Sequence, residues 1–411
     1  MTTPPELDRG AILRESGAAA RHLARICFKT GPPVRTGVEL EWTVHDVADP
    51  ARRVDPARLR AALGRHSPVT LDEASPAQPL RRGSAVSLEP GGQVELSTPP
   101  HTSIGALIRA TETDIAQVTG LLERAGLTLG GTGIDAYRQP QPVLETPRYR
   151  AMRRVFDRRG AAGRTMMYCT AGLQVCLDAG EPEQVPLRWA VAHAVGPPLL
   201  AAFATADRHA GRGTGWASFR MAAWLSTDPA RTGPVWSPAR PDDDPVTAWT
   251  RYVLAAPLLC LRTAGPDWTP PPDVTFADWL AGALPRPPTT DDLDYHVSTL
   301  FPPVRPRGYL ELRYLDAQPG REWMIPPAVL AALFADPATL HAAYLVSAPV
   351  AHRWHDAARA GLADRALATA AAHLLDLALA ALPRLDLPAE LNDEIHRGVR
   401  RRRAAAEGGD R

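Results

Sequence analysis

Apolar and polar residues alternate along four short segments of the chain, residues 37–44, 93–97, 172–178 and 308–314. Apolar side chains recur there at every second position, as in a β-strand that buries one face. The pattern predicts a sheet with one apolar face and one polar face. Such a sheet requires helices on its apolar face and leaves its polar face open.

Helical spacing of apolar residues separates these strands. It occurs in eight stretches, residues 6–26, 56–63, 104–125, 186–204, 246–261, 291–300, 326–334 and 351–382. Thr102 or Ser103 is the expected N-cap of the third stretch. Strands and helices together predict an α+β fold. A length of 411 residues permits one large domain or two smaller ones. We expect one domain over residues 1–411, with a helical C-terminal part, 336–411, packed on it.

The polar face of the predicted sheet is rich in carboxylates. The alternation places six functional side chains on it: Glu39, Glu41, Glu95, Glu311, Gln174 and Arg313. Carboxylates two positions apart on a strand lie roughly 6–7 Å apart and repel each other unless a cation lies among them. One such strand is compatible with a solvated surface. Four together favour divalent metal ions, and a set of oxygen ligands favours Mg²⁺ or Mn²⁺.

The stretch Val-Ser-Leu-Glu-Pro-Gly-Gly-Gln-Val-Glu-Leu-Ser, residues 86–97, adds a further carboxylate. Its Pro-Gly-Gly sequence predicts a tight turn. The turn places Glu89 and Glu95 on either side of a chain reversal. Arginines flank the same regions, among them Arg148, Arg220 and Arg313. Because guanidinium groups bind phosphoryl and carboxylate oxygens through paired N–H groups, the combination indicates metal-assisted phosphoryl transfer.

Lysine is nearly absent from the composition, because Lys29 is the one lysine among 46 basic residues. A P-loop, a protein kinase and a pyridoxal enzyme each need a lysine in a specific context. No glycine-rich stretch precedes Lys29. The abundance of Ala, Arg and Pro also fits a high-GC coding bias. Under either explanation, phosphate chemistry in this chain depends on arginine and metal.

The charge balance of 46 basic against 45 acidic residues argues against a dedicated nucleic-acid binder. The N-terminus lacks the order of a signal peptide, and the apolar stretches are too short or too broken by proline to span a bilayer. We therefore expect a cytoplasmic protein with no nucleic-acid or membrane partner, and a monomer is compatible with the sequence. The four cysteines form no C-x-x-C pair and are expected to be buried free thiols.

Several motifs occur in a fixed order along the chain. They include Gly-Val-Glu-Leu-Glu at 37–41, the stretch at 86–97, Thr-Ala-Gly-Leu-Gln-Val-Cys-Leu-Asp at 170–178, Ser-Phe-Arg at 218–220, Phe-Pro-Pro-Val-Arg at 301–305 and Tyr-Leu-Glu-Leu-Arg at 309–313. In this combination the chain resembles the glutamate–cysteine ligases of the plant and proteobacterial type, and most of all their actinobacterial members, which begin ergothioneine synthesis. The similarity runs from about residue 37 to about residue 335.

The resemblance implies a glutamine synthetase-like catalytic domain, with a curved, mainly antiparallel sheet, helices on one face and the active site on the other. It implies that ATP and Mg²⁺ or Mn²⁺ serve to join L-glutamate to L-cysteine through γ-glutamyl phosphate. The matching metal ligands are Glu39, Glu41, Glu89, Glu95, Glu311 and Gln174. Arg220 and Arg313 match arginines that contact phosphate or substrate carboxylate, and with Gln174 they are the expected cofactor-binding residues.

Two other functions remain compatible with the sequence. One is a ligase of the same superfamily with a different amine substrate, since residues 98–101 depart from the plant pattern. The other is a catalytically silent protein that binds a nucleotide or metal, although no matching carboxylate is missing. Four aromatic residues are candidates for a cysteine pocket: Tyr149, Tyr168, Trp216 and Trp224.

Overall fold

The computed structural model describes residues 10–241 and 243–408. Its centre is a six-stranded sheet in the order β3-β4-β1-β6-β10-β9, in which every neighbouring pair is antiparallel. The strands are β3 (Ala85–Leu88), β4 (Val94–Ser97), β1 (Thr36–Trp42), β6 (Gly172–Leu177), β10 (Leu310–Asp316) and β9 (Val304–Pro306). The four predicted strands form the middle of the sheet, and the predicted α+β class is confirmed.

The register of the strands brings the polar positions onto one face. Glu41 lies opposite Glu95, and Glu39 lies opposite both Ser97 and Gln174. Glu311 lies opposite Arg305 on the neighbouring strand. Because side chains alternate between the two faces of a sheet, these pairings gather side chains from five strands on one surface.

The first predicted strand is shorter than expected. It ends at Trp42, and residues Val44–Asp46 form β2, which leaves the central sheet and pairs with β5 (Leu127–Leu129). A short hairpin of β7 (Arg208–His209) and β8 (Arg212–Gly213) was not predicted. The edge strands β3 and β9 were also missed, because alternation over three or four residues is too brief to recognise.

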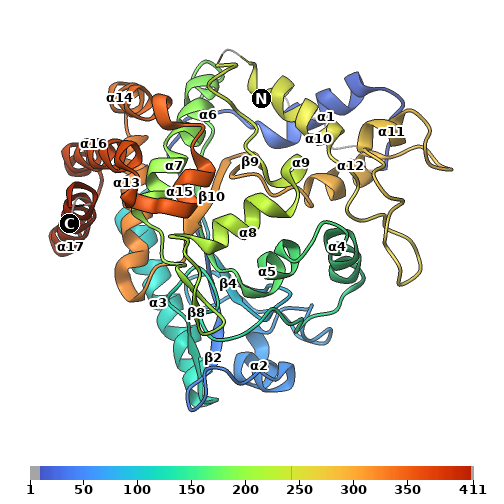
Figure 1. The fold of residues 1–411 in the computed structure, drawn as a ribbon, viewed down its shortest axis with the longest axis horizontal. Helices are drawn as coiled ribbons and strands as arrows, with labels where there is room; N and C mark the ends of the chain where they lie inside the picture. Colours follow the sequence, from blue (N-terminus) through green and yellow to red (C-terminus); the bar gives the residue numbers. More distant parts are fainter. Residues whose placement is uncertain (1–9, 242, 409–411) are drawn as a thin grey trace.

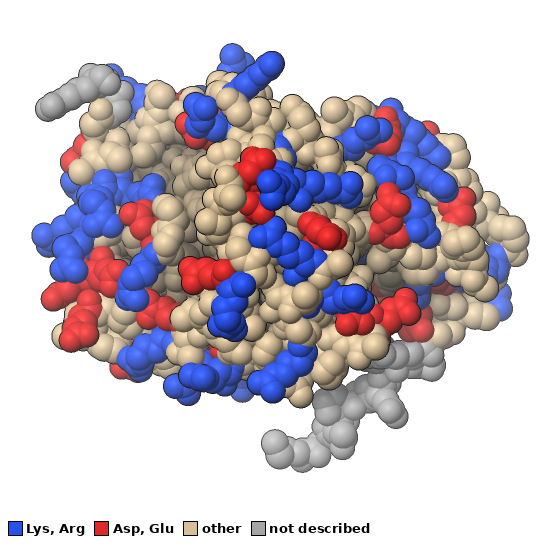
Figure 2. Space-filling view, turned by 90° about the horizontal axis from the view of Figure 1, so that it is seen from below, with Lys and Arg blue, Asp and Glu red and all other residues tan. Residues whose placement is uncertain are grey.

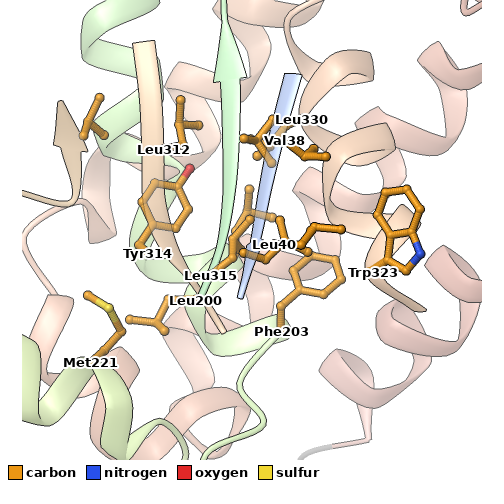
Figure 3. Packing of buried hydrophobic residues seen from close by; sticks show 14 of the residues in the cluster. Val38, Leu40, Leu200, Phe203, Met221, Leu312, Tyr314, Leu315, Trp323 and Leu330 are labelled. Atoms are coloured by element: carbon orange, nitrogen blue, oxygen red, sulfur yellow. The ribbon is translucent and has the colours of Figure 1, made fainter. Parts of the chain in front are cut away.

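Four helices cover the apolar face of the sheet: α3 (Ile104–Arg124), α6 (Val185–Ala194), α7 (Gly196–Ala202) and α13 (Ile325–Leu333). Ser103 caps α3 by accepting a hydrogen bond from the Ala106 N–H, as predicted. The predicted helix 186–204 is divided at Gly196, where two prolines follow. Figure 3 shows Val38 and Leu40 of β1 packed with Phe203 and Leu330 from the helical side.

A second helical layer lies outside the first (Figure 1). It contains α14 (Pro337–Ser347), α16 (Arg365–Ala381) and α17 (Ala389–Glu407), whereas α15 (Trp354–Ala360) packs against α7 and α8 (Phe219–Thr227). The single helix predicted over 351–382 is wrong, because Gly361 has a φ of 55° and Asp364 starts α16 as its N-cap. Buried residues of α17, such as Ile395, belong to the same apolar cluster as the sheet.

The segment Arg365–Arg384 is long and apolar enough to cross a membrane by length and composition. In this structure 56% of its apolar window is buried, and α16 packs against α7, α13, α14 and α17. A bent helix pair, Gly320–Leu333 with Pro337–Val350, passes the same test only as one broken span with a 108° bend. The packing of α16 is that of a core helix.

Three helices lie on the polar side of the sheet and correct the expectation that this face is open. They are α4 (Pro147–Asp157), α5 (Ala162–Cys169) and α8 (Phe219–Thr227) (Figure 1). The residues that start two of these helices lie directly before or at their first turn. Thr146 caps α4, followed by Pro147 at the first position, and Ser218 caps α8. The polar face is therefore the floor of an enclosed space.

A separate apolar cluster fills the region between four further helices. They are α1 (Ser16–Cys27), α10 (Pro245–Ala255), α11 (Phe276–Leu280) and α12 (Thr290–Val297). The helix predicted from residue 6 begins at Ser16 among the described residues, and residues 6–9 lie outside them. The helix predicted over 56–63 is confirmed as α2 (Pro56–Leu63), and α9 (Pro229–Thr232) was not predicted.

Candidate active site

A cavity of about 560 Å³ lies on the polar face of the sheet. The sheet forms its floor, α4, α5 and α8 supply walls, and the segment before β9 closes one side. Its charged lining residues are Glu39, Glu41, Glu89, Glu95, Arg148, Arg305, Arg307 and Arg313. The structure thus brings together four of the five carboxylates that the sequence singled out.

The carboxylates Glu39, Glu41, Glu89 and Glu95 form the anionic half of the cavity, over β3, β4 and β1. The predicted turn holds two of them in place, because the Gly92 N–H donates to the Glu89 carbonyl at 2.8 Å. Gly92 has a φ of 83°, and a Cβ on Gly91 would overlap the Tyr168 carbonyl. Glycine is therefore required at both positions.

Burial and mutual repulsion disfavour the charged form of three of these carboxylates, Glu39, Glu89 and Glu95. Burial, with Glu41 nearby, raises the pKa of Glu89 to about 7. Burial and the charge of Glu39 raise the pKa of Glu95 well above its usual value. The pKa of Glu39 is raised by burial first and by Glu311 second. Full ionisation of the anionic half therefore needs a cation.

The guanidinium groups of Arg305, Arg307 and Arg313 form the cationic half, around the fully buried carboxylate of Glu311. Arg305 Nε donates to Glu311 at 2.6 Å, Arg313 Nη1 at 2.9 Å and Arg307 Nη1 at 3.2 Å. Burial alone would raise the pKa of Glu311, but the guanidinium groups outweigh burial and lower it. Glu311 does not line the cavity. The geometry of Glu311 therefore indicates a counter-ion for the three arginines. This differs from the role of metal ligand that the sequence predicted for it.

Gln174 connects the two halves. Its Nε2 donates to Glu41 Oε1 at 2.9 Å, and its Oε1 accepts from Arg313 Nη1 at 2.5 Å. Glu41 Oε2 also accepts from the Gly172 N–H at 2.6 Å. The amide oxygen that was expected to reach a metal ion or nucleotide is thus engaged by Arg313. Gln174 is placed to hold Glu41 and Arg313 in position.

Arg313 is the arginine best placed to bind a ligand. It lines the cavity and lies 5.6 Å from the centre of the Trp224 ring. Its Nη1 is fixed by Glu311 and Gln174, but its buried Nε has no hydrogen-bond partner among the described residues. Because a buried N–H group without a partner is costly, this donor is available to an anionic ligand.

Arg220 lies beneath the cavity and does not line it. It is 1% exposed, its Nη2 donates to the Arg313 carbonyl at 2.8 Å, and its Nη1 lies 3.8 Å from Asp316. This placement differs from the predicted contact with phosphate or substrate. The helix N-terminus at Ser218 directs the Arg220 side chain toward the β10 backbone, which makes Arg220 a positioning residue for Arg313.

Sequence reasoning missed several lining residues. Arg305 and Arg307 belong to or follow a three-residue strand, which is too short to show alternation, although Arg305 ends the Phe-Pro-Pro-Val-Arg motif. Gln93 shares a face with Glu95, a signal that was available. Among the aromatic candidates, Tyr149 and Trp224 line the cavity, whereas Tyr168 and Trp216 do not.

The donors of the anionic half fit a hard divalent ion. Glu39, Glu41, Glu89 and Glu95 supply only oxygen, and a cation would relieve their repulsion. Within residues 10–241 and 243–408, however, no three or more His, Cys, Asp or Glu side chains are already arranged around a metal position. A metal ion would have to draw these carboxylates together, and its binding here stays a prediction.

A profile of glutamate–cysteine ligase family 2 (GCS2) matches residues 35–407. The chain belongs to this family. It is 40% identical over 398 residues to the glutamate–cysteine ligase EgtA of Mycobacterium tuberculosis, which covers 94% of this chain and 89% of the relative. It is 37% identical to EgtA of Mycolicibacterium smegmatis over 99% of this chain and 95% of that one. The resemblance drawn from the motifs is confirmed.

More distant members of the family agree. The chloroplastic glutamate–cysteine ligase of Medicago truncatula is 31% identical over 64% of this chain and 52% of its own. The crystal structure of the glutamate–cysteine ligase of Francisella tularensis in complex with AMP matches with a TM-score of 0.51 and 14% identity. That match covers 93% of this chain and 83% of the other. At this identity it shows a shared fold, in agreement with the predicted ligase-type antiparallel sheet.

Proposed function

We propose that this protein joins the γ-carboxylate of L-glutamate to the amine of L-cysteine at the expense of ATP. The products are γ-glutamylcysteine, ADP and phosphate. The observation that carries the proposal is the pairing of an anionic and a cationic half within one cavity. Phosphoryl transfer between anions requires both cation-binding carboxylates and donors to phosphate oxygens. The near full-length similarity to two EgtA ligases supports these substrates and a role in ergothioneine synthesis.

ATP is the proposed phosphoryl donor, and the AMP in the Francisella tularensis enzyme supports a nucleotide in this fold. Glu39, Glu41, Glu89 and Glu95 would hold Mg²⁺. When bound, Mg²⁺ would supply charge neutralisation and alignment of the phosphates. Arg313 would donate its free Nε–H to a phosphate or carboxylate oxygen. Glu311 and Gln174, which accept hydrogen bonds from Arg313 Nη1, would hold that guanidinium in place, so that no reorganisation accompanies charge development.

The chemistry then proceeds in two steps. A γ-carboxylate oxygen of glutamate attacks the γ-phosphorus of ATP, and γ-glutamyl phosphate and ADP form. The free amine of cysteine attacks the acyl carbon, the amide bond forms and phosphate leaves. No enzyme nucleophile is required. Burial raises the pKa of the Cys176 thiol, which faces the same surface, well above its usual value, so Cys176 is suited to remain an unreactive thiol.

A phosphate-release assay tests the proposal. The purified chain is incubated with ATP and Mg²⁺ together with glutamate, cysteine, both, or glutamate with other amino acids. We expect sustained phosphate release only with glutamate and cysteine together, and γ-glutamylcysteine by mass spectrometry. Sustained release with another amine but not with cysteine would favour the alternative ligase. Nucleotide binding without phosphate release in any mixture would favour a silent relative.

A further inference from the structure

Gln93 is a buried glutamine on the floor of the cavity. Its side chain is 2% exposed and lines the cavity beside Glu95. Its Nε2 donates to the Thr170 carbonyl at 2.9 Å and to the Met167 carbonyl at 3.4 Å. Only the amide NH₂ can face two carbonyl oxygens, so the orientation of the amide is fixed.

The other end of the same amide is unsatisfied. Gln93 Oε1 is buried and has no hydrogen-bond partner within the described residues. Buried amide oxygens are normally paired, so an oriented, unpaired acceptor on a cavity wall indicates that a ligand supplies the donor.

Three methionines line the same cavity as Gln93. They are Met152 of α4 and Met166 and Met167 of α5. Thioether side chains are apolar, polarizable and adaptable, so they suit a small, soft side chain better than a charged or strongly hydrated one. This corner thus combines an apolar wall with one acceptor.

We propose that Gln93 and the three methionines form the subsite for the side chain of the amine substrate, and that Gln93 Oε1 accepts a hydrogen bond from its thiol. The inference rests on the proposed ligase function. A thiol offers one donor and little hydration. A methyl group at the same place would leave Oε1 unpaired, and a hydroxyl group would lose more hydration against the methionines.

The charge of the two halves supports this placement. Gln93 lies in the anionic half of the cavity, with Glu89 and Glu95. The negative charge there favours the amine group of a substrate and disfavours a substrate that carries two carboxylates. Glutamate, which carries two carboxylates, is better accommodated by Arg305, Arg307 and Arg313. The two amino acids would therefore approach the reacting carbon from opposite halves of the cavity.

The test replaces Gln93 by methionine, which has similar length and no hydrogen-bonding amide. With ATP, Mg²⁺ and saturating glutamate, kcat/KM is measured for cysteine and for 2-aminobutyrate, in which a methyl group replaces the thiol. We expect Gln93→Met to lower kcat/KM for cysteine about tenfold and to leave that for 2-aminobutyrate unchanged. The preference for cysteine should therefore fall about tenfold.

Gln318→Met is the matched control. Gln318 is also 2% exposed and donates its Nε2 to carbonyls, those of Phe203 and Asp316. Its Oε1, however, accepts from Arg402, and it lies outside the cavity lining. The ratio of kcat/KM for the two amino acids should be unchanged in this variant.

Several outcomes would overturn the inference. Equal losses of kcat/KM for cysteine and 2-aminobutyrate in Gln93→Met would mean that Gln93 contacts the amine group or only stabilises the fold. No loss of kcat/KM for either amino acid would mean that Gln93 is not part of the subsite. If Gln93→Met does not fold, Met166→Gln decides: serine should gain about tenfold relative to cysteine, and an unchanged ratio contradicts the subsite. Failure of the wild-type protein to use cysteine at all would instead overturn the proposed function.

Discussion

The two halves of the cavity floor meet the same problem, buried charge, in opposite ways. Around Glu311, the protein supplies its own counter-ions in Arg305, Arg307 and Arg313. Around Glu39, Glu89 and Glu95, burial and like charges raise the carboxylate pKa values and leave the charge unbalanced. The buried carboxylate of the cationic half is therefore balanced without a ligand, whereas the carboxylates of the anionic half need a cation to balance them.

The exterior face drawn in Figure 2 differs from the cavity in this respect. Figure 2 shows basic and acidic side chains interspersed over one face of the exterior, in keeping with the net charge of +1. Inside, Gln174 marks the boundary, because it bonds Glu41 on one side and Arg313 on the other. Charge separation on this scale costs stability and is retained where it serves binding.

The largest expected effect comes from breaking the cationic half. Glu311→Gln removes the charge from a fully buried partner of three arginines. We expect a loss of about 3–5 kcal/mol in the free energy of unfolding, together with loss of turnover. Urea unfolding followed by tryptophan fluorescence measures it. Glu89→Gln is the control from the anionic half and should not be destabilised; equal stability of both variants would contradict the comparison.

The second effect concerns the free donor of the cationic half. Arg313→Lys keeps a positive charge but removes the unpaired Nε–H and the planar guanidinium. We expect kcat/KM to fall about 100- to 1000-fold, by analogy with other lost charge-stabilising donors worth roughly 3–4 kcal/mol. Arg109→Lys, on an exposed position of α3, serves as the control. A fall of less than about threefold for Arg313→Lys would place the anion site elsewhere.

The third effect tests whether a cation completes the anionic half. Mg²⁺ at about 100 times its Kd should stabilise the wild-type protein by about 2.7 kcal/mol. Glu89→Gln and Glu95→Gln should lose most of this stabilisation, because each removes a carboxylate from the cavity. Thermal unfolding with Mg²⁺ and with a chelator measures the difference. An Mg²⁺-induced rise in Tm that is the same in both variants and the wild type would argue against metal binding by these residues.

The last effect lies outside both halves of the cavity and concerns how the free energy of unfolding depends on pH. Burial lowers the pKa of His193 to about 4 and that of His296 to about 3. The unfolded chain therefore binds more protons than the folded one below about pH 6.5. The free energy of unfolding should be largest above that pH and fall toward pH 4, by about 1.4 kcal/mol per pH unit for each histidine at most.

Urea midpoints at pH 7 and pH 5 check this. His193→Phe should flatten the dependence, because it removes one of the two titrating groups. His373, an exposed residue of α16, is the matched position, and His373→Phe should leave the slope as it is in the wild type. If the urea midpoint changes equally with pH in His193→Phe and in the wild type, His193 is not one of the groups responsible for the pH dependence.

Much of the fold could be predicted from the sequence, for a physical reason. A period of two over five or more residues places Glu39, Glu41 and Glu95 on one face, whatever else the chain does. The turn at Gly91 and Gly92 was predictable because only glycine fits there. The helices α4, α5 and α8 were missed because they are short and partly polar, and their caps carry little signal without the sheet beside them.

In the candidate site, too, some features could be predicted from the sequence and others could not. The sequence by itself determined which carboxylates share a surface, that any phosphate chemistry in this chain would depend on arginine instead of lysine, and, through its motifs, the family. Only the tertiary structure decided that Glu311 is balanced by Arg305 and Arg307, that Arg220 lies beneath the cavity, and that the buried Gln93 Oε1 has no partner among the described residues. Alternation along a strand fixes the face on which a side chain lies, but its partners come from distant segments, and burial and hydrogen bonding select among them only after the chain has folded.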